Sequence, residues 1–197
     1  MKSRPSTKEL GFTLIELAVV IALVGLLLGS LMVPLATQVE ARQTREARRI
    51  LEDAREALAG FAIANGRLPC PASSASNGLE SPAGGGDCTN DQDGFLPAAT
   101  LGLMPTDQQG FAIDPWGNRI RYAVTNANDS AFTTANGIST QYLTTVPSPD
   151  LQVCSTGIGI TGGKCAAGAA ITTIAVAVLF SLGPNGLAGG TSPDEAP

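Results

Sequence analysis

The residues best placed to do chemistry lie near the start of the chain, in the segment Gly11-Phe12-Thr13-Leu14-Ile15-Glu16. Glu16 is a carboxylate at the edge of an apolar run, with no cationic side chain near it in sequence. A charge at such a boundary is costly unless it has a partner. Cleavage of the peptide bond after Gly11 would free an amine at Phe12, at about the depth of Glu16. The segment therefore predicts proteolysis at Gly11 and an ion pair between the new amine and Glu16.

A basic leader and an apolar run flank this segment. Residues 1–11 carry three cationic side chains and one acid, and a basic leader stays on the cytoplasmic side of a membrane. From Leu17 to Leu35 only Ser30 is polar, and as a helix this run spans roughly 28 Å, close to the hydrocarbon thickness of a bilayer. A secretory signal would place its cleavage site after the apolar run, whereas Gly11 precedes it. We therefore expect the apolar helix to be kept, as a transmembrane segment over 12–37.

The glycine, the acid at its spacing, the basic leader and the apolar run together resemble the prepilin motif of type IV pilins and type II secretion pseudopilins. The resemblance implies cleavage between Gly11 and Phe12 by a prepilin peptidase, and N-methylation of Phe12. It also implies that Glu16 pairs with the Phe12 amine of a neighbouring subunit, in a filament built by an inner-membrane assembly platform. A plain single-span anchor with an accidental glutamate is the alternative, which the joint occurrence of the four features disfavours.

Composition narrows the classes of function further. The 197 residues suit one membrane segment plus one domain of ordinary size. A net charge of −5 without a basic patch argues against nucleic acid as a partner. The chain has no histidine, which removes Ser-His-Asp and Cys-His catalysis, and no spacing suggests a carboxylate pair or a Ser-Lys arrangement. We expect a structural protein and not an enzyme.

Four cysteines in a chain whose body lies outside the cytoplasm indicate two disulfides. Three connectivities are open. We favour local pairing, Cys70 with Cys88 and Cys154 with Cys165, because it needs the least loop closure. A zinc site is the competing interpretation, and the absence of any CxxC pair disfavours it.

A long helix followed by a sheet is the fold that the remaining pattern predicts. Apolar residues recur at three- and four-residue steps between Gln38 and Phe61, and Asn65-Gly66-Arg67-Leu68-Pro69 then ends a helix that spans about 12–64. Strands are expected at 118–125, 141–146, 151–154 and 171–181, with Ile174–Phe180 in the centre of the sheet. Three or four antiparallel strands laid on the amphipathic half-helix would bury both apolar faces. The expected class is α+β, and the resemblance implies its pilin-like form.

Three short pieces of the domain resemble the type II secretion major pseudopilin. They are residues 65–69 after the long helix, Asp114-Pro115-Trp116-Gly117-Asn118 before a strand, and Phe180-Ser181-Leu182-Gly183-Pro184-Asn185-Gly186 near the end. An aspartate at the start of the second piece favours a turn, which Trp116 is expected to anchor against the core.

In that family the final glycine-rich loop binds calcium through acidic side chains and backbone carbonyls. In this chain Asn185 stands where an aspartate is usual, and only Asp194 and Glu195 follow it. Calcium takes six to eight oxygen ligands, so these three side chains would need carbonyls or water to complete a site.

The expected organisation is a leader over 1–11, a transmembrane or filament-core helix over 12–37, an amphipathic helix over 38–64 and a globular domain over 65–197. The domain divides into an irregular connector (65–115), an antiparallel sheet (116–183) and a C-terminal loop (184–197). We expect a subunit of a type II secretion pseudopilus or type IV pilus-like filament, in the bacterial inner membrane with its domain periplasmic or in an extracellular filament. The cysteine-bearing segments 70–88 and 154–165 are foreign to the major pseudopilin pattern, so a minor tip or adhesin-like pilin that binds a substrate or surface is the alternative.

Overall fold

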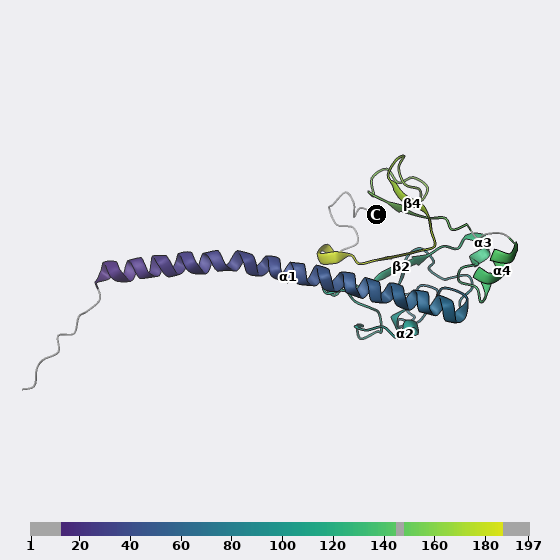
Figure 1. Ribbon diagram of the computed structural model, residues 1–197, viewed down its shortest axis with the longest axis horizontal. Helices are drawn as coiled ribbons and strands as arrows, with labels where there is room; N and C mark the ends of the chain where they lie inside the picture. The colour runs from purple at the N-terminus through teal and green to yellow at the C-terminus, as the bar shows by residue number, and fades with distance from the viewer. Residues whose placement is uncertain (1–12, 145–147, 187–197) are drawn as a thin grey trace, which may run out of the picture. The chain divides into compact units, whose positions relative to one another are not determined.

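One helix, α1 (Leu14–Asn65), is the longest element of the protein (Figure 1). The computed structural model describes the backbone of residues 13–144 and 148–186, with side chains for all of these except 27–37, 141–144 and 185. The chain divides into two units, residues 1–42 and 43–197, and α1 contributes to both. The prediction of one helix over about 12–64 is confirmed within the described residues.

The part of α1 that belongs to the second unit is amphipathic, as its spacing predicts. Ala47, Ala54 and Leu58 are buried, whereas the charged side chains of this stretch are mostly exposed. The helix ends as expected, because Gly66 adopts φ of +63° and its N–H donates to the carbonyl of Ala62 at 2.9 Å. A left-handed residue at this position is typical of a glycine-capped helix end.

A three-stranded antiparallel sheet packs on this amphipathic half of α1. Its strands are β1 (Gly94–Phe95), β2 (Arg121–Val124) and β5 (Ala177–Phe180), in the order β1-β2-β5. Tyr122 pairs with Leu179 and Val124 with Ala177, so these four side chains share one face. That face meets α1 in a core cluster made of Ala54, Leu58, Leu96, Ala98, Ala112, Ile120, Tyr122 and Val124.

The most apolar stretch of the domain is not the centre of this sheet, which corrects the prediction for Ile174–Phe180. The predicted strand over 171–181 is divided at Val176 into β4 (Ala170–Ala175) and β5. β5 is an edge strand, and β2 is the central one. Residues of β4 and β5 need not be buried on both faces, and Ile171 and Ile174 are indeed 69% and 67% exposed. The continuous apolar run therefore belongs to two strands that lie in different sheets.

A separate two-stranded sheet is formed by β3 (Leu151–Cys154) and β4. The bounds of β3 are those predicted from the sequence. The two strands pair with register shifts, so that Leu151 lies opposite Ala175 and Val153 opposite Thr172. Such shifts are typical of β-bulges, which accommodate an extra residue in one strand.

The strand predicted at 141–146 is wrong where the structure describes it. Residues Gly137–Thr144 form helix α4, which the backbone bond from Thr140 N–H to the carbonyl of Asn136 (2.9 Å) helps to begin. Its β-favouring composition is a weak preference that local hydrogen bonding overrides here. Helix α3 (Ala127–Ser130) precedes it, and both lie near the end of α1 (Figure 1). Residues 145 and 146 lie outside the described part.

The connector predicted over 65–115 is largely irregular but contains β1 and the short helix α2 (Ala98–Leu101). Leu96 and Ala98 from this stretch are fully buried in the core cluster. The connector thus supplies core side chains as well as joining α1 to β2.

Candidate functional site

The first turn of α1 contains the acid on which the prepilin interpretation depends. The Thr13 N–H and Thr13 Oγ1 both donate to Glu16 Oε2, at 3.0 and 2.8 Å, and the Glu16 N–H donates to Thr13 Oγ1 at 3.3 Å. This reciprocal arrangement is a capping box, which satisfies otherwise unpaired N–H groups at a helix start. Gly11 and Phe12 lie outside the described residues, so the cleavage and methylation sites stay predictions.

The helix that follows Glu16 exposes its apolar side chains in the single chain. Leu14, Ile15, Ile21 and Leu26 are between 63% and 87% exposed. Apolar surface of this extent marks a region that contacts other apolar groups. In the part of the chain for which the structure gives side chains, no helix is both long and apolar enough to cross a membrane.

Two of the three motifs that resemble the major pseudopilin, residues 114–118 and 180–186, lie against each other in the domain. Asp114 is 3% exposed, and its Oδ1 accepts hydrogen bonds from the backbone N–H groups of Trp116 (3.0 Å) and Asn118 (2.8 Å). Its Oδ2 accepts a bond from Ser181 Oγ at 2.6 Å. Asn118 Nδ2 donates to the carbonyl of Gly183 at 2.7 Å. The aspartate therefore forms the predicted turn and also holds the start of the C-terminal motif.

Trp116 contributes less to the core than its sequence context predicts. It is only partly buried and is not part of the core cluster. Asp114 holds the turn instead, through the hydrogen bonds described above. The sequence suggested the tryptophan because it is the only one in the chain.

The residues expected to bind calcium lie outside the described part of the structure. These are Asp194, Glu195 and the side chain of Asn185, whose backbone belongs to the short 3-10 helix η1 (Gly183–Asn185). Among the described residues, no three His, Cys, Asp or Glu side chains are grouped as a metal site would require. The carbonyl of Gly183 already accepts the bond from Asn118.

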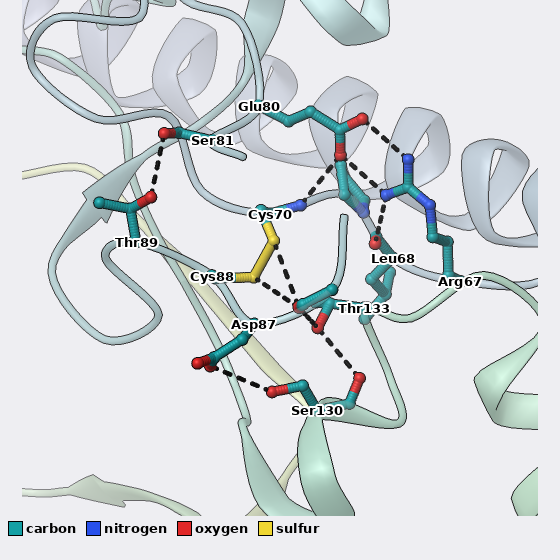
Figure 2. The surroundings of a disulfide bond; sticks show 12 residues. Arg67, Leu68, Cys70, Glu80, Ser81, Asp87, Cys88, Thr89, Ser130 and Thr133 are labelled. Atoms are coloured by element: carbon teal, nitrogen blue, oxygen red, sulfur yellow. Dashed lines mark hydrogen bonds and ion pairs between the residues drawn. A yellow bond between two sulfur atoms is a disulfide. The ribbon is translucent and has the colours of Figure 1, made fainter. Parts of the chain in front are cut away.

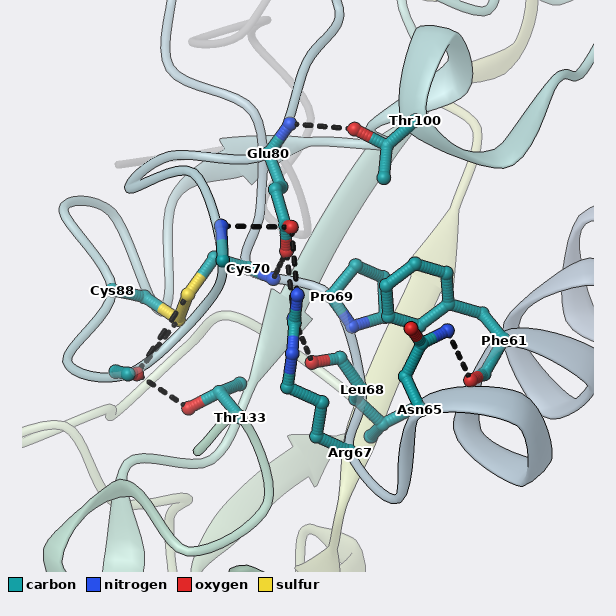
Figure 3. A network of polar contacts seen from close by, with 12 residues as sticks. Phe61, Asn65, Arg67, Leu68, Pro69, Cys70, Glu80, Cys88, Thr100 and Thr133 are labelled. Atoms are coloured by element: carbon teal, nitrogen blue, oxygen red, sulfur yellow. Dashed lines mark hydrogen bonds and ion pairs between the residues drawn. A yellow bond between two sulfur atoms is a disulfide. The ribbon is translucent and has the colours of Figure 1, made fainter. Parts of the chain in front are cut away.

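A nearly buried ion pair fixes the loop after α1. Arg67 Nη1 and Nη2 donate to the two carboxylate oxygens of Glu80, each at 2.8 Å, and the two side chains are only 8% and 10% exposed (Figure 3). The Glu80 oxygens also accept the backbone N–H groups of Cys70 (3.2 Å) and Gly84 (3.1 Å). A bidentate, charge-assisted pair of this kind is specific in its geometry.

The Arg67–Glu80 pair favours the ionised form of the Glu80 carboxyl. Burial alone would raise the pKa of the Glu80 carboxyl, but the hydrogen bonds and positive charge of Arg67 outweigh it and hold the pKa below its ordinary value. The Arg67 guanidinium also lies over the ring of Phe61, 5.1 Å from its centroid. Arg67 thereby connects the last turns of α1 to the loop that carries Glu80.

Both disulfides form with the local pairing. Cys70 is bonded to Cys88, with Cα atoms 5.4 Å apart, and the loop between them contains Glu80 (Figure 2). Beside this bond, the carbonyl of Gly86 accepts a hydrogen bond from Thr133 Oγ1 at 2.7 Å, which ties the loop to the segment after α3. Cys154 is bonded to Cys165, also with Cα atoms 5.4 Å apart, and closes the turn between β3 and β4.

Sequence reasoning missed the partners that hold the predicted residues in place. Thr13 stands three residues before Glu16, the spacing of a capping box, and this signal was available. The Arg67–Glu80 pair spans thirteen positions of an irregular loop, and no local sequence pattern predicts such a contact.

Comparison with family models shows that residues 6–32 match the prokaryotic N-terminal methylation motif. Comparisons with curated proteins and with solved structures find no match. The matched residues include Gly11, Phe12 and Glu16 and reach into the exposed apolar stretch of α1. The motif implies assembly with other pilin subunits after processing by a prepilin peptidase. The chain therefore carries the N-terminal signal of type IV pilins and pseudopilins, on a pilin-like α+β fold.

Proposed function

We propose that this chain is a structural subunit of a type II secretion pseudopilus or a type IV pilus-like filament. The methylation motif over residues 6–32, continuous with a 52-residue helix, is the observation that carries the proposal. Prepilin peptidase cuts between Gly11 and Phe12, the Phe12 amine is methylated, and an inner-membrane platform assembles the subunits. The apolar half of α1 holds the chain in the inner membrane before assembly and forms the filament core afterwards.

Glu16 exchanges partners on assembly. Among the described residues of the single chain, its carboxylate accepts hydrogen bonds from the hydroxyl and the N–H of Thr13, within its own first turn. The cationic amine of a neighbour's Phe12 is a stronger partner than a neutral hydroxyl, because it adds the attraction of an opposite charge, which is large in apolar surroundings. In apolar surroundings an unpaired Glu16 carboxylate would be costly. The incoming helix is therefore most stable in the register that places its Phe12 amine beside Glu16.

The globular domain supports the pseudopilin version of the proposal. The turn at Asp114 and the motif at Gly183 resemble the major pseudopilin in sequence, and they are hydrogen-bonded to each other in the structure. Two disulfides suit the periplasm or the outside of the cell, where thiols are oxidised.

Substitution of Glu16 separates processing from assembly. Glu16→Ala should leave cleavage at Gly11 largely intact and reduce the amount of sheared filament at least tenfold. Glu9→Ala is the control, because that acid is removed with the leader and its loss should leave both steps unchanged. Normal incorporation of Glu16→Ala subunits into filaments would contradict the mechanism.

A further inference from the structure

The outer edge of β5 presents backbone groups without a partner among the described residues. Of the strands that the structure describes in this sheet, β5 pairs with β2 alone, along one side. Along β2 the N–H of Thr125 donates to Val176 on the β5 side (2.9 Å), whereas the N–H of Val124 donates to Asp91 on the opposite side (2.8 Å). Antiparallel strands alternate in this way, so residues opposite Val124 and Tyr122 point their N–H and C=O groups away from β2. In β5 these residues are Ala177 and Leu179.

A groove opens at the same edge, between β5 and α1. It has a volume of about 710 Å³, and its lining includes Leu51, Leu58, Leu68, Ala177 and Leu179, together with the charged side chains of Arg48, Glu52 and Arg55 of α1. We call it the edge groove. Leu51, Leu68, Ala177 and Leu179 pack against the core cluster but remain only partly buried. The edge groove therefore combines an apolar floor with unpaired strand backbone.

This combination fits an extended segment better than a helix. A strand added to a sheet edge satisfies the free N–H and C=O groups, and its alternate side chains enter the adjoining pocket. Exposed sheet edges are templates for such pairing with another chain. The methylation motif implies assembly with other pilin subunits, so we take another subunit as the source of the added strand.

The chain itself contains a segment suited to the edge groove. In Gly157-Ile158-Gly159-Ile160 the isoleucines stand two apart and are 60% and 47% exposed. No backbone hydrogen bond within the described residues involves Gly159 or Ile160. Ile171 and Ile174 are also exposed, but they belong to β4, which is already paired with β3. Side chains two apart lie on the same face of an extended strand.

We propose that the edge groove of one subunit receives the 157–160 segment of a second copy of this chain as an added strand. The contact rests on the proposed function, since it requires subunits that assemble. Donor and acceptor are different surfaces of the same chain, and such a heterologous contact builds an open filament wherever its rotation does not close a ring. Gly159 has φ of +76° in the single chain. Because glycine populates positive and negative φ about equally readily, it can change from this conformation to the extended one without strain in either.

Hydrogen exchange of the full-length chain tests the contact directly. The amides of Ala177 and Leu179 should exchange at least tenfold more slowly in sheared filaments than in unassembled subunits solubilised in detergent. The amide of Val178, which points toward β2, serves as an internal reference and should change less.

Substitution tests the donor segment. The double variant Ile158→Glu/Ile160→Glu should lose the slowed exchange at Ala177 and Leu179 and yield at least tenfold less filament. Ile63→Glu is the matched control, because Ile63 is 87% exposed on α1 and does not line the edge groove. Unprotected Ala177 and Leu179 amides in wild-type filaments would overturn the inference and leave the proposed function standing. Protected Ala177 and Leu179 amides in filaments of the double variant would have the same consequence. A wild-type chain that forms no filament would overturn both.

Discussion

Asn118 and Gly183 are hydrogen-bonded across 65 positions of sequence, with Asn118 Nδ2 donating to the Gly183 carbonyl at 2.7 Å. The same asparagine is held by Asp114, whose Oδ1 accepts its backbone N–H. Asp114 also accepts the hydroxyl of Ser181. A single buried carboxylate therefore organises two segments that are far apart in the chain, and the geometry of the C-terminal motif depends on it.

Removal of the Asn118 amide should loosen this link. Asn118→Ala leaves the Gly183 carbonyl without its side-chain donor, and we expect the free energy of unfolding to fall by about 1–3 kcal/mol. Denaturant unfolding of the detergent-solubilised chain, followed by circular dichroism, measures the loss. Asn126→Ala is the control, because Asn126 is exposed and its side chain caps no helix end. Equal midpoints for the two variants would contradict the role of Asn118.

The Arg67–Glu80 pair predicts a loss of stability in acid. The pKa of Glu80 is lower in the folded state than in the unfolded one, so its contribution is complete above the unfolded pKa and is lost as the pH falls through the folded pKa. Glu80→Gln should therefore have a flatter stability profile below about pH 5 than the wild type. The exposed acid Glu56, changed to Gln, is the control in the same thermal unfolding series. A Glu80→Gln profile parallel to that of the wild type would rule out this explanation.

Tyr122 predicts the opposite pH dependence in alkali. Burial raises the pKa of its phenol far above the ordinary value, with a further contribution from the charge of Glu80. The folded state therefore keeps the neutral phenol, and the stability that this provides is lost as the pH rises above the unfolded pKa of about 10. Ultraviolet titration should show Tyr122 ionising only together with unfolding, and Tyr122→Phe should lack that step.

The same tyrosine donates its hydroxyl to the carbonyl of Pro69 at 3.1 Å. Tyr122→Phe keeps the ring in the core but leaves that carbonyl unpaired, which should cost about 1 kcal/mol near pH 7. An unchanged unfolding midpoint would mean that the bond contributes no net stability.

The two disulfides should differ in their effects when removed. Each closes a loop whose constraint on the unfolded chain is worth about 3 kcal/mol in the chain-entropy account. The Cys70–Cys88 loop also contains Glu80, so Cys70→Ser/Cys88→Ser should lower the melting temperature of the domain more than Cys154→Ser/Cys165→Ser. The second variant should mainly make the β3–β4 turn sensitive to proteases. Limited proteolysis with mass spectrometry distinguishes the two, and equal losses of melting temperature would contradict the prediction.

The sequence predicted those parts of the fold that local patterns specify. The periodic apolar face of α1 and its glycine-capped end follow from spacing, and β3 was found with its bounds because it is short and well delimited. The division of residues 171–181 at Val176 was missed, because an apolar run does not reveal where a strand changes its partner. Helix α4 was missed because single-residue preferences are weaker than the hydrogen bonds formed around Asn136.

The features of the candidate site also divide into those that local sequence specifies and those that depend on the folded domain. Glu16 and the cysteines could be identified from residue type and spacing, because their roles depend on short-range sequence. The contacts of Asp114 with Ser181, and of Arg67 with Glu80, depend on how distant segments meet in the folded domain. No local sequence pattern contains that information, so these contacts became apparent only with the structure.

Intact-mass measurement of the protein from its native host tests the central claim most directly. The account predicts a mature chain that begins at Phe12, carries one added methyl group on its amine and has all four cysteines oxidised. Fragmentation should place the methyl group on Phe12. A chain that retains residues 1–11, or one that begins after the apolar run, would contradict the account.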